Sequence, residues 1–180
     1  MLNLIKEFAI KSHEDVNHKY GVYPYSYHLS MVVDVAKEFI DSIPEEDREM
    51  ILSACWMHDT IEDCRLTYND VKEVAGLKVA EIVYALSNEK GKNRKERANE
   101  KYYKGIRETE YACFVKLCDR IANVKHSKKE RSKMFDVYKK ENENFINQLF
   151  PKNRVRNVFD LFALHKLEDV FECDSSQTVL

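Results

Sequence analysis

Apolar residues recur at helical spacing along almost the whole chain, and this periodicity limits the fold most. Leu29, Val32, Val33, Ala36 and Phe39, for example, line one face of a helix if the segment is helical. The 180 residues include only four glycines and three prolines, too few for the many tight turns that sheets need. The sequence therefore predicts an all-α protein, a helical bundle with one continuous core.

Caps and helix-breaking residues divide this pattern into segments. The expected helices run over about residues 2–16, 26–40, 45–62, 67–75, 79–86, 111–124, 131–150 and 153–171. A capping box is expected at Ser42, with Pro44 in the first turn of the helix that follows, and a second cap at Thr67. Gly76 is expected to end the 67–75 helix. We expect a single domain over residues 1–172 and a frayed tail over 173–180.

Bulk charge and cysteine content point to a cytoplasmic protein that binds neither nucleic acid nor membranes. The net charge is -2 and the pI is near 6.3, so there is no overall attraction to polyanions. The five cysteines are an odd number without Cys-x-x-Cys spacing, and they resemble reduced core residues. The N-terminal segment is amphipathic and acidic, and no apolar run approaches the roughly 20 residues of a membrane span.

The stretch from Ala54 to Asp63 ends an apolar run in four protonatable side chains. If residues 51–63 are helical, His58 shares a face with Glu62, and Asp59 shares one with Asp63. Like charges crowded at the end of a buried helix need a positive partner, such as a metal ion. The stretch therefore predicts a functional site.

Two further segments supply residues for that site. The helix that follows Tyr111 is strongly apolar and carries Asp119 and Asn123 on one face, while His28 lies near the start of the 26–40 helix. His28, His58, Asp59 and Asp119 can meet as a mixed nitrogen and oxygen ligand set suited to Mn, Fe or Zn.

A metal ion held in this way would favour hydrolysis of phosphate esters. Glu62 and Asp63, one turn beyond, could orient or deprotonate the attacking water, or protonate the leaving oxygen.

Plainer interpretations stand beside this one. His58 could be a cation that satisfies the last carbonyls of a helix, in a purely structural bundle. The basic stretch, residues 87–104, is most simply a solvated helix face. The remaining histidines are expected at the surface or in helix caps: His13, His18, His126 and His165.

The order and spacing of these motifs resemble the HD-domain metal-dependent phosphohydrolases. The resemblance is greatest to the hydrolase domain of the RelA/SpoT alarmone enzymes and to the small Mesh1-like hydrolases. Their His-Asp-x-x-Glu-Asp motif corresponds to residues 58–63, and their Lys-Leu-x-Asp-Arg-x-x-Asn motif to residues 116–123. The resemblance covers about residues 5–130.

The resemblance implies one Mn ion held by His28, His58, Asp59 and Asp119, with water activated by Glu62 and Asp63. It implies that Asn123 positions substrate or water, and that pyrophosphate is removed from the ribose 3′ position of ppGpp or pppGpp. It gives the basic stretch a second interpretation, in which Lys90, Arg94 and Arg97 neutralise phosphates. No synthetase domain is expected within these 180 residues.

The loop before His28 departs from the family. It is shorter, offers only Lys19 as a cation, and carries tyrosines such as Tyr25 that could stack on a base. The alternatives are a broader HD phosphohydrolase acting on NADPH or a nucleoside phosphate, and a nucleotide-binding module without turnover. Lys19 and Tyr25 join the candidate substrate contacts.

Overall fold

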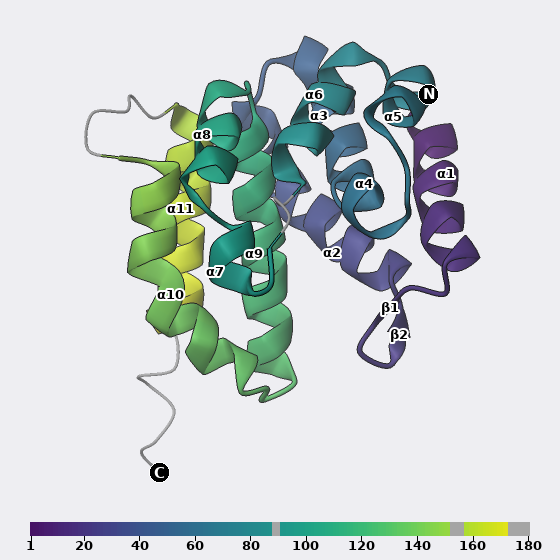
Figure 1. Cartoon of the computed structure of the whole chain (residues 1–180). Helices are drawn as coiled ribbons and strands as arrows, with labels where there is room; N and C mark the ends of the chain where they lie inside the picture. The colour runs from purple at the N-terminus through teal and green to yellow at the C-terminus, as the bar shows by residue number, and fades with distance from the viewer. Residues whose placement is uncertain (88–90, 152–156, 173–180) are drawn as a thin grey trace.

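The chain folds into helices, as its apolar periodicity predicts (Figure 1). The computed structural model describes residues 1–87, 91–151 and 157–172, with the backbone alone at residues 94 and 95. The first half contains α1 Leu2–Asp15, β1 Lys19–Tyr20, β2 Tyr23–Pro24, α2 Ser26–Lys37, the 3-10 turn η1 Ile40–Ser42, α3 Glu45–Met57, α4 Thr60–Asp63, α5 Tyr68–Ala75 and α6 Leu77–Leu86. The second half contains α7 Arg94–Arg97, α8 Glu100–Glu108, α9 Ala112–Lys129, α10 Met134–Leu149 and α11 Val158–Glu172.

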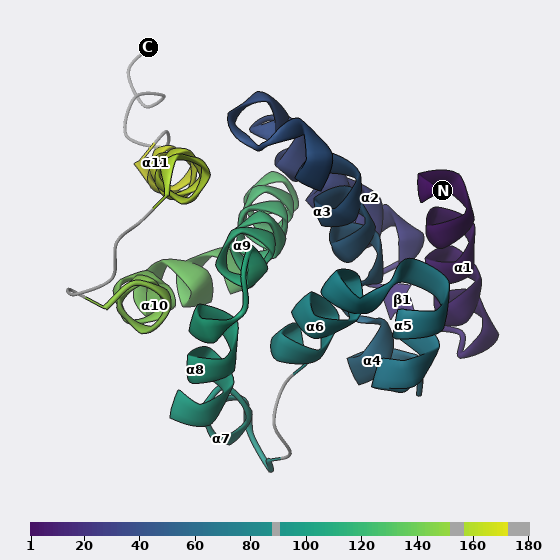
Figure 2. The same ribbon diagram turned by 90° about the horizontal axis from the view of Figure 1, so that it is seen from above.

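Helix α9 lies at the centre of the molecule. It packs against α2, α3 and α6 on one side and against α8, α10 and α11 on the other (Figure 2). Most of its first thirteen residues are buried, in agreement with the apolar run that predicted it. The hydrophobic core extends from Ile5 on α1 to Phe171 on α11 without a break. Polar groups on α9 are therefore held by packing on all sides.

The helix expected over residues 45–62 is present as α3 and α4, but regular helix is interrupted at His58 and Asp59. His58 Nδ1 donates to the Cys55 carbonyl at 2.9 Å, and Thr60 Oγ1 donates to the Met57 carbonyl at 2.7 Å. Side chains thus take carbonyls that a continuing helix would have used. Asp59, at φ −104° and ψ 1°, turns the chain into α4. The Asp63 N–H still donates to the Asp59 carbonyl at 2.9 Å, so these two residues lie one helical turn apart, as expected.

Of the two expected helix caps, the one at Thr67 is confirmed and the one at Ser42 is wrong. Thr67 and Asp70 form a complete capping box at the start of α5, and Gly76 ends that helix with a φ of 88°. The capping box at Ser42 is wrong, because Ser42 Oγ donates to the Phe39 carbonyl within the preceding 3-10 turn. Pro44 then occupies the N-cap position of α3.

A short antiparallel hairpin connects α1 and α2 in place of the expected loop. Lys19 pairs with Pro24 and Tyr20 with Tyr23. Gly21 occupies the turn with a φ of 62°, a conformation that favours glycine. The hairpin matters because it places Tyr20 beside His28.

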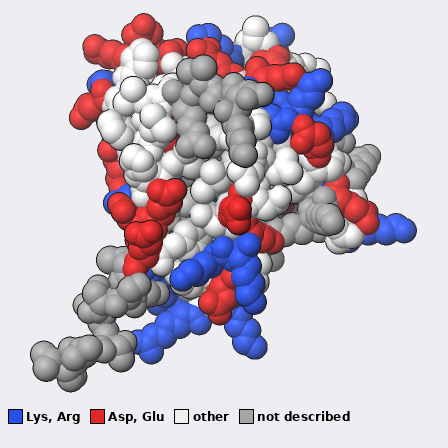
Figure 3. Space-filling model, turned by 90° about the vertical axis from the view of Figure 1, so that its left-hand side faces the viewer, with Lys and Arg blue, Asp and Glu red and all other residues white. Residues whose placement is uncertain are grey.

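Charges of both signs are interspersed on the face formed by the C-terminal helices (Figure 3). Within the described residues, no helix is both long and apolar enough to cross a lipid bilayer. The described cysteines, Cys55, Cys64, Cys113 and Cys118, are buried free thiols, and Cys173 lies outside the described residues.

Candidate metal and hydrolytic site

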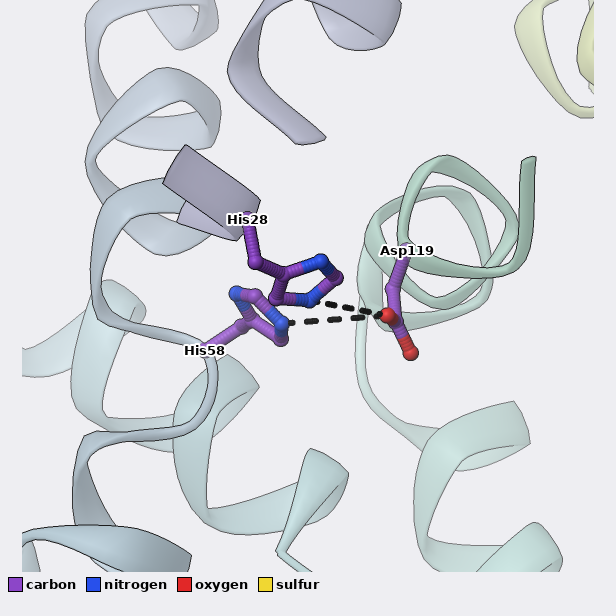
Figure 4. A group of neighbouring side chains, drawn as sticks. All are labelled: His28, His58 and Asp119. Atoms are coloured by element: carbon purple, nitrogen blue, oxygen red, sulfur yellow. Dashed lines mark ion pairs between the residues drawn. The ribbon is translucent and has the colours of Figure 1, made fainter. Parts of the chain in front are cut away.

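Three residues far apart in the sequence converge where α2, the end of α3 and α9 meet (Figure 4). His28 Nε2 lies 3.3 Å from Asp119 Oδ1, and His58 Nε2 lies 3.9 Å from the same oxygen. Atoms that share a metal centre at about 2.1 Å are separated by up to about 4.2 Å, so both distances suit common ligation. The structure therefore brings together three of the four predicted ligands in a metal-binding arrangement.

The hydrogen bonding of His58 fixes which ring nitrogen faces the site. Its Nδ1 carries a proton, since the Cys55 carbonyl can only accept. Its Nε2 is buried and has no hydrogen-bond partner among the described residues, although Asp59 Oδ2 is only 2.8 Å away. Histidines that bind metals commonly donate their second N–H to a carbonyl in this way. The arrangement fits a metal ligand.

The charge balance of the site favours a cation. Burial alone would lower the pKa of His58, but Asp59 and Asp119 outweigh it and raise that pKa to about 9. Burial likewise opposes ionisation of Asp119, yet Lys116 and the two histidines hold its pKa well below the usual range. The two carboxylates therefore raise the affinity of His58 for a proton, which shows that the site favours positive charge.

Asp59, the fourth predicted ligand, lies against both histidines. Its Oδ2 is 2.8 Å from His58 Nε2 and 3.7 Å from His28 Nε2, and it accepts a 2.5 Å hydrogen bond from Tyr25 Oη. It is not part of the tightest group, which comprises His28, His58 and Asp119. Its role as a ligand stays a prediction.

The expectation of a surface or capping residue is wrong for His13, whereas His18 is partly exposed. His13 is 1% exposed, and its Nδ1 lies 3.0 Å from His18 Nδ1. Both rings stack on Tyr25, with centroids 4.4 and 3.9 Å from that of the phenol. Tyr25 therefore has protein partners for its ring and its hydroxyl, and a direct contact between Tyr25 and substrate stays a prediction.

Asp63 lies on the same side of the site. Its Oδ2 is 3.7 Å from His18 Nδ1. Burial, together with the nearby charges of Asp59 and Glu62, raises the pKa of Asp63 to about 7. Asp63 therefore exchanges a proton near neutral pH, as an acid or base in hydrolysis would.

Asn123 bridges the hairpin and the metal-binding group. Its Nδ2 donates to Asp119 Oδ1 at 2.5 Å, and its Oδ1 accepts from Tyr20 Oη at 2.7 Å. Tyr20 also stacks on His28, with ring centroids 4.8 Å apart. Tyr20 was not predicted as part of the site, because its contact with His28 depends on the unexpected hairpin.

A pocket of about 720 Å³ opens beside Asp119. Its walls come from α4, α7, α8, α9 and α10, and include Glu62, Arg97, Tyr102, Lys116, Asn123 and Glu141. Such a volume suits a nucleotide-sized ligand. Lys116 Nζ lies 3.0 Å from Asp119 Oδ2, so a cation stands directly beside the metal-binding group.

The predicted substrate contacts are only partly in place. Arg97 lines the pocket, whereas Lys19, exposed on β1, is not among the lining residues. Lys90 and the side chain of Arg94 lie outside the described residues. Lys116 and Arg120 also line the pocket but were not among the predicted contacts, although both stand in the motif that contains Asp119.

Comparison with known proteins agrees with the resemblance seen in the motifs. The chain is 36% identical over 124 residues to a guanosine-3′,5′-bis(diphosphate) 3′-pyrophosphohydrolase of Aquifex aeolicus, covering 66% of this chain and 16% of that protein. It is 26% identical over 110 residues to the pyrophosphohydrolase MESH1 of Danio rerio, covering 61% and 53% respectively. The chain thus spans about half the length or less of these curated relatives, and no family model matches it.

A solved structure, described as a metazoan ortholog of SpoT that hydrolyzes ppGpp, has a similar fold. The TM-score is 0.69 at 20% sequence identity, covering 97% of this chain and 95% of the other. The predicted all-α, HD-type fold and the resemblance to SpoT-type and small alarmone hydrolases are therefore confirmed.

Proposed function

We propose that this chain is a metal-dependent hydrolase that removes pyrophosphate from the ribose 3′ position of ppGpp or pppGpp, leaving GDP or GTP. The observation that carries the proposal is the buried group of His28, His58 and Asp119, of which Asp119 lines a pocket of about 720 Å³. The relatives named as ppGpp hydrolases support the choice of substrate.

The ion is proposed to be Mn²⁺, with Fe or Zn as alternatives that the same donor set accepts. His28, His58 and Asp119 would hold it, and Asp59 is the proposed fourth ligand. When bound, a divalent ion supplies polarisation of a phosphoryl oxygen and a lower pKa for the attacking water. Tyr25 and Asn123 hold the carboxylates of Asp59 and Asp119 in fixed orientations.

Glu62 and Asp63 are proposed to accept and donate the protons that move during hydrolysis. Water attacks the phosphorus that is bonded to the 3′ oxygen, and the bond between that phosphorus and the 3′ oxygen breaks. One water proton goes to the carboxylate pair, and the 3′ oxygen takes a proton from it, so that the pair ends unchanged. Glu62 lines the pocket, and Asp63 is the next residue of α4.

Cations on the pocket wall are proposed to bind the phosphates. Lys116 stays protonated, because Tyr102 and Asp119 outweigh the effect of burial and keep its pKa well above the usual value. Arg97 faces the same pocket. We retain Lys19, Lys90 and Arg94 as further proposed contacts, and we propose a cytoplasmic location for the reaction, where free thiols such as Cys55 stay reduced.

The test is a substrate panel incubated with purified protein and Mn²⁺. The panel contains ppGpp, pppGpp, NADPH and nucleoside monophosphates, and products are separated by ion-exchange chromatography. The proposal expects GDP or GTP together with pyrophosphate from the first two, and loss of turnover after chelation. Turnover of NADPH or a monophosphate alone would contradict the proposed substrate.

A further inference from the structure

The wall of the pocket formed by α10 carries an acidic residue, Glu141. Tyr138, Glu141 and Phe145 lie at positions i, i+3 and i+7 of α10, so they share one face, and all three line the pocket. Glu141 is partly buried and is the acid on this wall, whereas Lys116 stands on the α9 wall beside Asp119. Lys116 therefore lines the pocket next to the metal-binding group, and Glu141 is the acid that α10 contributes.

Arg120 of α9 holds this wall in place. Its guanidinium carbon lies 4.7 Å from the ring centroid of Tyr138 and 4.3 Å from that of Phe145. Its Nη2 lies 3.5 Å from Glu141 Oε2, and the residue is 6% exposed. A buried guanidinium fixed by two rings gives Glu141 a defined position, which recognition of a rigid ligand requires.

The charges orient a nucleotide in the pocket. Phosphates are attracted to Lys116 and Arg97, whereas the positive charge of Arg120, which also lines the pocket, is offset by the carboxylate of Glu141. The base of a bound nucleotide therefore faces α10 while its phosphates face the metal-binding group.

We propose that Glu141 recognises the guanine base, accepting hydrogen bonds from guanine N1–H and the exocyclic 2-amino group. The inference rests on the proposed function, which places a guanosine nucleotide in this pocket. Guanine presents two adjacent donors on that edge, and an ionised carboxylate is an acceptor only. Adenine presents one donor and one acceptor there, so its N1 would meet a second acceptor.

This assignment gives the base a contact that the loop before His28 does not provide. The hairpin residue Tyr25 is engaged with His13, His18 and Asp59, and does not line the pocket. Glu141 lines the pocket on a helix that packs against α9, so its carboxylate is held by rigid elements.

The experiment compares guanosine, inosine and adenosine 3′,5′-bis(diphosphates) with the unchanged protein and with Glu141→Gln. Loss of a well-formed pair of hydrogen bonds lowers discrimination by about ten- to a hundredfold. The unchanged protein is expected to prefer guanosine, with inosine intermediate because it lacks the 2-amino group. A glutamine offers one acceptor and one donor, which matches adenine, so Glu141→Gln is expected to shift the ratio of kcat/KM values toward adenosine.

Two controls distinguish a role of Glu141 in base recognition from an effect of the substitution on folding. Glu141→Gln keeps an acceptor for Arg120. Glu143→Gln, on the same helix but exposed and outside the pocket lining, is expected to leave the ratio unchanged. Equal use of the three bases by the unchanged protein, or an unaltered ratio in Glu141→Gln, overturns the assignment.

Binding of GDP, IDP and ADP, measured by calorimetry, gives the same preferences without turnover. If ppGpp is not hydrolysed but GDP binds more tightly than ADP and Glu141→Gln reverses the order, the proposed function fails and the assignment of Glu141 stands. If ppGpp is hydrolysed but Glu141→Gln leaves the order of binding unchanged, the assignment alone fails.

Discussion

Tyr25 Oη donates a 2.5 Å hydrogen bond to Asp59 Oδ2, the oxygen that lies against both His28 and His58. The phenol is 9% exposed, and its ring is stacked on His13 and His18. Tyr25, at the N-cap of α2, thus orients the carboxylate of Asp59, the proposed fourth ligand. Contacts of this kind commonly change metal affinity or activity by about ten- to a hundredfold.

Tyr25→Phe removes this hydrogen bond and keeps the ring stacking. We expect the affinity for Mn²⁺ to fall by about tenfold or more, because Asp59 loses the contact that orients it. A metal titration followed by calorimetry measures the change. Tyr23→Phe is the matched control, since Tyr23 is 38% exposed and lies at the end of the hairpin away from Asp59. Equal affinities for the two variants would refute the orienting role.

Asp119→Ala should abolish the stabilisation that a bound metal confers. Binding to the folded state alone raises stability by RT ln(1 + [L]/Kd), about 2.7 kcal/mol at a hundredfold excess over Kd. We expect chelation to lower the Tm of the unchanged protein and to leave that of Asp119→Ala unaltered. Asp34→Ala, at an exposed residue of α2, should behave as the unchanged protein does. A Tm of the unchanged protein that is insensitive to both chelator and Mn²⁺ would contradict the metal site.

Glu62→Gln and Asp63→Asn should lower kcat by about a hundredfold or more, the usual contribution of a general acid or base. Neither side chain belongs to the metal-binding group, so the affinity for Mn²⁺ should stay within a few-fold of that of the unchanged protein. Steady-state kinetics and metal titration of the same preparations separate the two effects. The exposed residue Glu73 on α5 supplies the control Glu73→Gln. Full activity in both variants would mean that other groups move the protons.

His13 should make the protein less stable in acid. Burial lowers the pKa of His13 to about 4, against the opposing effect of Asp59, whereas the unfolded chain has its ordinary value of 6.5. Between these values the unfolded state binds more protons, so the free energy of unfolding falls as the pH falls from 6.5 toward 4. Urea unfolding at pH 7 and pH 4.5 should show a loss on the order of 2 kcal/mol that His13→Gln removes.

His165→Gln, at an exposed position of α11, should retain the full acid-dependent loss of stability. A loss of the same size in His13→Gln would show that other groups cause it. His18 has a lowered pKa for the same main reason, burial, and a smaller share of the acid-dependent loss is expected from it.

The sequence was sufficient to predict which residues converge on the metal-binding group. His28 and His58 lie near the ends of apolar helices, and Asp119 lies on the buried helix α9, so the packing of these helices brings the three side chains together. The break after Met57 was not predictable from periodicity. It depends on His58 and Thr60 bonding to backbone carbonyls, a choice that tertiary contacts decide.

The environment of the site was harder to predict than its centre. His13 and His18 are polar residues at the end of α1 and beyond it, and only the hairpin that follows turns Tyr25 onto them. Glu141 likewise carries no sequence signal among the other acids of α10. Its place in the pocket follows from how α10 packs against α9 through Arg120.

The most direct test of the proposed function is hydrolysis of ppGpp by the purified protein with Mn²⁺ in water enriched in ¹⁸O. Attack on the phosphorus bonded to the 3′ oxygen predicts equal amounts of GDP and pyrophosphate, with one ¹⁸O atom in the pyrophosphate and none in GDP. Asp119→Ala should give neither product. Release of orthophosphate in place of pyrophosphate, ¹⁸O in the nucleotide, or no reaction at all would contradict a 3′-pyrophosphohydrolase.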